Sequence, residues 1–214
     1  MNNTFQQKAG IALLIFVVLL VFTMVLHPIG GNIERIIKIT GVIVTIHAIA
    51  IFSLPFGCIG CWGITRRLGH THFLPLLGFI MATFGLLTAL LAATANGLVL
   101  PLFLQHYKDA EPAVLESIRP VVRYSFALNL AFDYIYTCAF SLAILCWSGT
   151  IIRQRSWPAW IGWLGIVIIV AVTITLACGI AVNSLKGLRY FVTAIVIWLL
   201  LVGVRLYREK GNGE

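Results

Sequence analysis

FALNLAFDYIYTCAF, residues 126–140, is the stretch of sequence that decides the fold, because it places one carboxylate, Asp133, in an otherwise apolar run. None of the other acidic residues lies in a strongly hydrophobic segment. A charged side chain at membrane depth costs about 2.5–3.5 kcal/mol on insertion scales, so it needs a polar partner or a function. The stretch therefore predicts a membrane helix whose polar face is turned toward other helices.

Composition extends this prediction to the whole chain. The 214 residues are 60% hydrophobic and 10% charged, whereas globular proteins average roughly 45–50% apolar and 25% charged residues. The net charge of +8 comes from Lys and Arg residues between hydrophobic runs. There they set orientation and contact lipid headgroups, so we expect the lipid bilayer as a partner and no nucleic acid. The five cysteines lie in or beside apolar runs, where cysteine behaves as a small hydrophobe and does not indicate a disulfide framework.

The hydrophobic runs predict an all-α, polytopic membrane fold with six transmembrane helices in one bundle and a single domain. Each run is about 18 residues or longer, which is enough to cross a hydrocarbon core of about 30 Å. The predicted spans are residues 9–26, 39–62, 73–100, 124–147, 158–183 and 188–207. Between the third and fourth spans, Pro112 and Pro120 bracket residues 112–119, which predicts a short helix lying on the membrane surface.

Six spans place both termini on one side of the membrane. Lys and Arg are divided almost equally between the two sides, but the terminal side carries compact positive pairs in very short loops: Arg66, Arg67, Arg153 and Arg155. Positive charges in short loops favour the cytoplasmic side. We therefore expect a plasma or inner membrane protein with both termini in the cytoplasm.

The polar residues inside the spans gather at one depth. His47 lies about eight residues into the second span and Asp133 about ten into the fourth, and both spans begin on the non-cytoplasmic side. At about 1.5 Å per residue their depths differ by only about 3 Å. The residues expected to line a common pocket in this leaflet are Asp133, Asn129, His47, Asn96, Tyr136 and Thr137.

Two interpretations of this cluster remain open. It is either a ligand pocket or a buried hydrogen-bond network that keeps the helices in register. In a pocket for a small or amphipathic ligand, bound or transported, Asp133 and His47 would act as proton acceptor and donor or as ligands for a cation. Intramembrane ionisable residues are functional by default. The sequence therefore favours the pocket, which faces the non-cytoplasmic side.

A metal-dependent hydrolase acting on a lipid-like substrate is the alternative function. Three imidazoles and one carboxylate can hold zinc with an open position for water. The residues of this hypothetical site are His27, His47, His106 and Asp133. A second candidate zinc site, which depends on the conformation of a loop, combines Cys58, Cys61, His70 and His72. Neither set forms a recognised helical metal-binding motif, and whether the protein is an enzyme stays open.

The third functional class is an accessory or assembly subunit of a membrane complex. Small residues recur at helical spacing along the third span, on a face that also carries Asn96: Gly78, Ala82, Gly85, Ala89 and Ala92. Such a face lets a second helix approach closely. It predicts a helix-mediated contact, either with another protein or in an oligomer.

Overall fold

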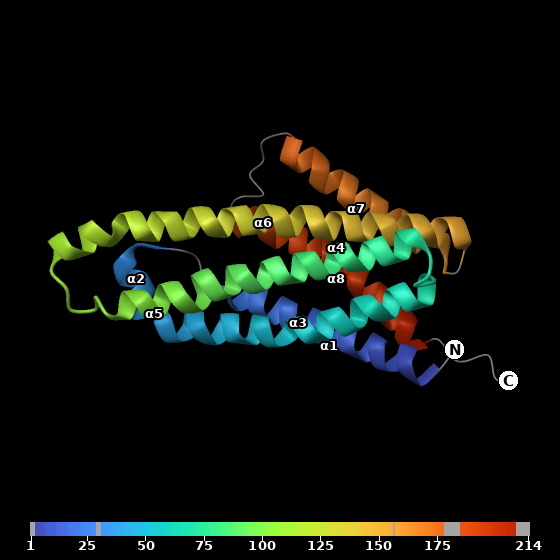
Figure 1. Ribbon diagram of the computed structural model, residues 1–214, viewed down its shortest axis with the longest axis horizontal. Coiled ribbons are helices and arrows are strands. Elements are labelled where there is room, and N and C mark those ends of the chain that lie inside the picture. The colour runs from blue at the N-terminus through green and yellow to red at the C-terminus, as the bar shows by residue number, and fades with distance from the viewer. Residues whose placement is uncertain (1–2, 29–30, 156, 178–184, 209–214) are drawn as a thin grey trace.

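The computed structural model describes residues 3–28, 31–155, 157–177 and 185–208, and these ranges are almost entirely helical, without strands (Figure 1). The elements in chain order are α1 Asn3–Leu26, α2 Ile33–Lys38, α3 Thr40–Leu68, α4 Phe73–Ala92, the π-helical segment η1 Ala93–Val99, α5 Leu100–Gln105, α6 Pro112–Gln154, α7 Ala159–Ala177 and α8 Leu185–Arg208. The all-α prediction is confirmed.

Five of the described helices are long and apolar enough to cross a membrane. These are α1, α3, the continuous rod of α4, η1 and α5, then α6 and α8, while α7 is a shorter apolar helix. The lengths and compositions indicate a multi-pass membrane protein. The last residues of the predicted fifth span, 178–183, lie outside the described ranges.

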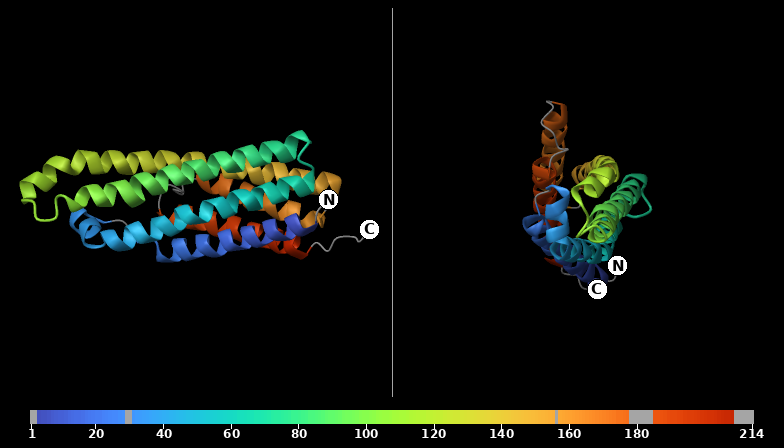
Figure 2. Two further views of the ribbon diagram at one scale, coloured as in Figure 1. Left: turned by 60° about the horizontal axis from the view of Figure 1, so that its bottom comes forward. Right: turned by 90° about the vertical axis from the view of Figure 1, so that its left-hand side faces the viewer.

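The long helices run side by side, and the described ends of the chain lie together at one end of the bundle (Figures 1 and 2). At the opposite end are α2, α5 and the first turns of α6. α7 packs beside α6 near the terminal end and then diverges from the bundle, as the end-on view of Figure 2 shows.

Several helices extend beyond the predicted spans, because intrahelical hydrogen bonding does not stop where the hydrocarbon ends. α1 begins at Asn3, where the ring of Phe5 lies 4.5 Å from the guanidinium carbon of Arg66. α3 continues six residues past Trp62 to Leu68 and ends at Gly69, whose φ of 97° is left-handed. Glycine adopts this conformation without the steric cost that a Cβ would bring.

The predicted surface helix at residues 112–119 is wrong. These residues are the first turns of α6, which continues through Pro120 to Gln154. A proline inside a helix removes one backbone hydrogen bond, but here the neighbouring Ile118 and Val122 are buried in a hydrophobic cluster. At about 1.5 Å per residue α6 is roughly 64 Å long, about twice the hydrocarbon thickness, so its first turns lie outside the membrane core.

We call α2, α5 and residues 112–122 of α6 the cap. Its hydrophobic cluster consists of Ile33, Ile36, Leu100, Leu104, Ile118 and Val122, together with Ile43 of α3. The Nε2 of Gln105 donates to the carbonyl of Ile37 and to the hydroxyl of Thr40, both at 2.7 Å. The cap is therefore a small packed layer at the end of the bundle opposite the termini.

The main core is centred on Trp147, which is fully buried. Its indole stacks on Trp198 with ring centroids 6.2 Å apart, and its Nε1 donates to the Thr65 hydroxyl at 3.0 Å. Gly78 leaves room for this ring, since a Cβ there would lie 2.7 Å from the indole nitrogen. A Cβ at Gly85 would likewise meet Phe140 at 3.0 Å.

The small-residue face of α4 therefore receives α6 of the same chain. The prediction of an accessory subunit was based on this face. Its glycines, Gly78 and Gly85, already pack against Trp147 and Phe140 of α6. The sequence pattern identified a close helix contact correctly, but the partner helix belongs to this chain.

Candidate functional site

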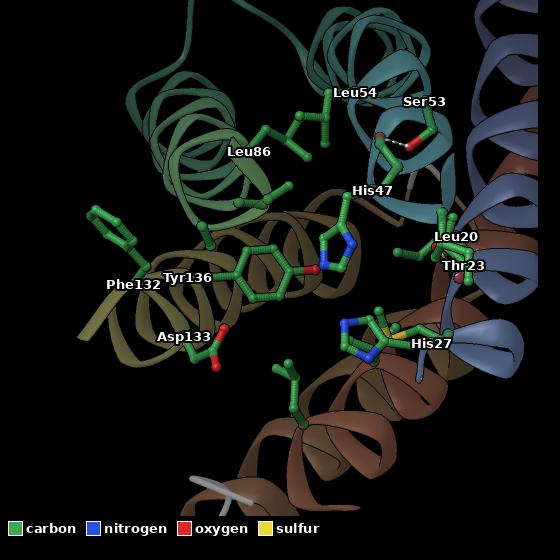
Figure 3. Close-up of a pocket in the computed structure, with 18 of the residues that line it drawn as sticks. Leu20, Thr23, His27, His47, Ser53, Leu54, Leu86, Phe132, Asp133 and Tyr136 are labelled. Carbon is green, nitrogen blue, oxygen red and sulfur yellow. Dashed lines mark hydrogen bonds between the residues drawn. The ribbon is translucent and has the colours of Figure 1, made fainter. Parts of the chain in front are cut away.

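An inner cavity of about 240 Å³ lies among α1, α3, α4, η1, α6 and α8. Most of its wall is apolar. The polar residues that line it are Thr23, His27, His47, Ser53, Asn129, Asp133 and Tyr136. In Figure 3, Asp133 and Tyr136 project from α6 toward the two histidine rings, which come from α3 and from the end of α1.

Asn96 and Gly97 lie in η1, the π-helical interruption of the rod that begins with α4. Such interruptions occur frequently at functional sites. A Cβ at Gly97 would overlap the imidazole of His47, so the glycine makes room for this ring. The Nδ1 of His47 lies 2.8 Å from the Ile43 carbonyl, which can only accept, so Nδ1 is the donor. In the neutral ring Nε2 is then an acceptor.

A relay of side chains joins η1 to α6 and ends at the cavity. The Ser125 hydroxyl donates to Asn96 Oδ1 at 2.9 Å, and Asn96 Nδ2 donates to Asn129 Oδ1 at 3.1 Å. Asn129 Nδ2 then donates to Asp133 Oδ2 at 2.9 Å. Ser125, Asn129 and Asp133 follow one another at intervals of four residues on α6, and so they share one helical face.

The carboxylate end determines the direction of this relay. An ionised carboxylate only accepts, so Asn129 must present its amide nitrogen to Asp133 and its oxygen to Asn96. Asn96 must then donate its own nitrogen and accept from Ser125. All donors point toward Asp133, and aligned hydrogen bonds of this kind polarise one another. The relay thus delivers one amide donor, from Asn129, to the carboxylate of Asp133.

His27 follows directly after the last residue of α1, just beyond the span. Its ring lies edge-on to His47 with centroids 5.0 Å apart, and its Nδ1 lies 3.1 Å from the Pro28 carbonyl. Arg189 Nη2 donates to the backbone carbonyl of His27 at 2.7 Å, which ties α8 to the end of α1. Burial lowers the pKa of the His27 imidazole to about 4, and the nearby His47 and Arg189 act in the same direction. His27 is therefore neutral near pH 7.

Two further cavities continue from the inner cavity toward the cap. The middle cavity, about 250 Å³, shares His27, His47 and Asn129 with the inner one and reaches Arg35. The outer cavity, about 590 Å³, lies between α2 and α6. It shares Gly31 and Phe126 with the middle one, so the three cavities are neighbours in a series from the cap to Asp133.

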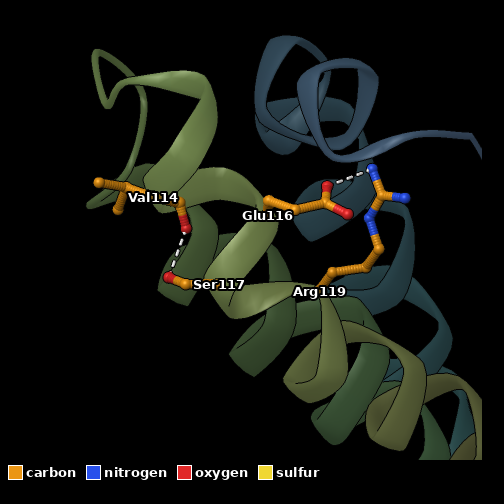
Figure 4. A network of polar contacts seen from close by, with 4 residues as sticks. All are labelled: Val114, Glu116, Ser117 and Arg119. Atoms are coloured by element: carbon orange, nitrogen blue, oxygen red, sulfur yellow. Dashed lines mark hydrogen bonds and ion pairs between the residues drawn. The ribbon is translucent and has the colours of Figure 1, made fainter.

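Charged side chains surround the outer cavity. They are Glu34, Glu116, Arg119 and Arg123. Glu116 and Arg119 form an ion pair at 2.7 Å on the exposed surface of α6 (Figure 4). This end of the series is polar and accessible to water, whereas the walls around Asp133 are mainly apolar.

No family model, no curated protein and no solved structure matches the chain.

The structure brings together five of the six residues predicted to line the pocket, at the inner cavity, the middle cavity or both: Asp133, Asn129, His47, Asn96 and Tyr136. Thr137 does not line these cavities, and its buried hydroxyl has no described hydrogen-bond partner. Helical spacing predicts the side of the helix on which a residue lies, but it does not predict how deep along the helix the cavity extends. That depth depends on packing, such as that of Tyr136 against Phe140 and Phe191.

The surrounding helices also differ from the prediction. α1 and α8 line the inner cavity, whereas the residues predicted to line the pocket came from the second, third and fourth spans only. Ser125 was missed as the start of the relay. Its spacing of four from Asn129, repeated from Asn129 to Asp133, was a signal that could have found it.

The two predicted metal sites are not assembled. Within the described ranges, no group of three or more His, Cys, Asp or Glu side chains could hold a metal ion. His106 is exposed at the end of α5, with Nδ1 3.1 Å from the Leu102 carbonyl. His70 lies edge-on to Trp62, and Cys58 and Cys61 are free thiols. Of the first set, the inner cavity contains His27, His47 and Asp133 without His106.

Proposed function

We propose that this membrane protein binds a small or amphipathic ligand in the inner cavity and exchanges it with the side opposite its two termini. The proposal is supported mainly by Asp133, the last residue of the relay, which receives few hydrogen bonds from the protein. Among the described residues, only the amide of Asn129 donates to Asp133, and this carboxylate lines a cavity. A purely structural network would be expected to satisfy a carboxylate at this depth from several sides.

The cavity supports a ligand with one polar end. Its polar groups come from α6, α3 and the end of α1, and its remaining walls are aliphatic or aromatic, including Phe16, Leu54 and Leu86. Ligand pockets usually have volumes of about 300–1,000 Å³. The inner cavity alone lies below this range, which favours a small molecule.

The proposed orientation places the cap outside the cytoplasm. Arg66 and Arg67 close α3 at the terminal end of the bundle, and Arg153 closes α6 there. Positive residues beside short connections favour the cytoplasmic side. A fluorescent protein fused after Glu214 is expected to fluoresce, because its fold matures in the cytoplasm, while an alkaline phosphatase fusion at the same site is expected to be inactive. The opposite pair of results would contradict the orientation.

Filling the inner cavity tests the binding proposal. Ala89 lines this cavity from α4, and its replacement by tryptophan would occupy the ligand volume. We expect at least one of three small aromatic amphiphiles (2-phenylethylammonium, 2-phenylethanol or 3-phenylpropanoate) to raise the melting temperature of the wild type saturably. Ala89→Trp is expected to weaken that binding about tenfold or more, since each 1.4 kcal/mol lost is a factor of ten.

The matched control is Leu91→Trp, two residues along the same rod, whose side chain is 53% exposed on the outside of the bundle. It adds the same indole without entering the cavity, so binding should remain. If none of the three amphiphiles binds the wild type, or if both tryptophan variants bind equally well, the proposed site is wrong.

A further inference from the structure

We propose that the ligand of the inner cavity carries an ammonium group that pairs with Asp133, so that the site selects small amphipathic amines. This inference rests on the proposed function and specifies the ligand class of the same cavity.

The charge of the inner cavity favours a cationic ligand. Among the described residues that line it, Asp133 is the only carboxylate, and no Lys or Arg side chain lines it. His27 is neutral near pH 7. From α8 the lining residues are the apolar Leu188 and Val192. The neighbouring Arg189 donates to the His27 carbonyl, and no ion pair with Asp133 is formed within the described ranges.

The cations in the series of cavities lie away from the carboxylate, Arg35 at the middle cavity and Arg119 and Arg123 at the outer one. Arg35 lines the middle cavity and not the inner one, and it is exposed on α2. Exposed charges are strongly screened by water and salt. Arg35 therefore leaves the inner carboxylate available for a cationic ligand.

The hydrogen-bonding groups of the inner cavity offer more free acceptors than free donors. The hydroxyls of Thr23 and Ser53 donate to backbone carbonyls of their own helices, at 2.9 and 2.6 Å. The Nδ1 atoms of His27 and His47 are likewise directed at backbone carbonyls.

The donors of these four side chains are therefore already used within the protein. In neutral rings, both Nε2 atoms remain as acceptors, in addition to the oxygens of Asp133. The hydroxyl of Tyr136 can either donate or accept. An ammonium group offers three donors and no acceptor, so it complements this set.

Other charged ligands fit less well. An anion would meet the carboxylate and the unprotonated ring nitrogens. A hard metal cation such as Ca²⁺ needs six to eight oxygen ligands, but the amide oxygens of Asn96 and Asn129 are already used in the relay. The rings of Phe132 and Tyr136 also line the cavity, and aromatic faces attract ammonium groups.

The experiment compares probes of one shape on the purified full chain in lipid nanodiscs near pH 7. Dissociation constants are taken from the saturable rise in melting temperature. We expect 2-phenylethylammonium to bind about tenfold or more tightly than 2-phenylethanol, because it forms a charge-assisted hydrogen bond. We expect 3-phenylpropanoate to bind most weakly. In Asp133→Asn, which retains an oxygen to accept from Asn129, the advantage of the amine should fall below about threefold.

A second comparison needs only the wild type, so it is independent of how well Asp133→Asn folds. The quaternary analogue 2-phenylethyltrimethylammonium has the same charge but no N–H donor, and we expect it to bind about tenfold more weakly than the primary amine. Equal binding of the two cations would overturn the pairing of N–H donors with acceptors.

The failures of the two proposals can be told apart. If 2-phenylethanol or 3-phenylpropanoate binds the wild type as well as the amine, and Ala89→Trp abolishes that binding, the cavity binds ligands but the amine preference is wrong. If Asp133→Asn keeps the full preference for the amine, Asp133 is not its partner. If no probe binds the wild type, the proposed function itself fails.

Discussion

Trp147→Ala is expected to lower the free energy of unfolding by about 3–5 kcal/mol, the usual cost of truncating a large buried aromatic side chain. The indole is completely buried between α4, α3 and α8, where it stacks on Trp198. Its removal would leave a void against Gly78, which has no side chain to fill it. It would also take away the donor at 3.0 Å from the Thr65 hydroxyl. Unfolding by a denaturing detergent, followed by tryptophan fluorescence, measures the change.

The same substitution at Trp160 is the control, because its side chain is 54% exposed on α7. Lipid replaces most of the contacts that an exposed membrane residue would lose, so Trp160→Ala should change the unfolding free energy by less than about 1 kcal/mol. Equal losses in the two variants would show that packing around Trp147 does not hold the bundle together.

The helical architecture could be predicted from the sequence because a bilayer imposes two simple requirements. A span must be apolar over about 20 residues, and its backbone must be hydrogen-bonded internally. The ends of the helices follow no such requirement. In the first turns of α6, Ile118 and Val122 are buried in one hydrophobic cluster with Ile33 and Ile36 of α2, which lie far away in sequence.

Part of the site could be predicted from the depth of each residue in the membrane and from the side of the helix on which it lies. A regular rise per residue places His47 and Asp133 at similar levels, and the structure finds both lining one cavity. The neighbours of each helix do not follow from depth, so α1 and α8 were not expected around this cavity. The π-helical segment η1 was also not predicted, since its altered register depends on how Asn96 and Gly97 pack against α6 and α3.

Gly97→Ala is the substitution expected to disturb the site most directly. Alanine in a helix is normally more favourable than glycine by about 1 kcal/mol, and Gly41→Ala should show this gain, because its Cβ would meet nothing within 4 Å. At Gly97 the same Cβ would overlap the ring of His47, and overpacking of this kind costs about 1–3 kcal/mol. We therefore expect Gly97→Ala to melt at a lower temperature than Gly41→Ala. We also expect it to bind 2-phenylethylammonium about tenfold more weakly, because His47 must leave its position beside the cavity. If the two alanine variants are equally stable and bind the amine equally well, the close contact between Gly97 and His47 does not hold the imidazole in the site.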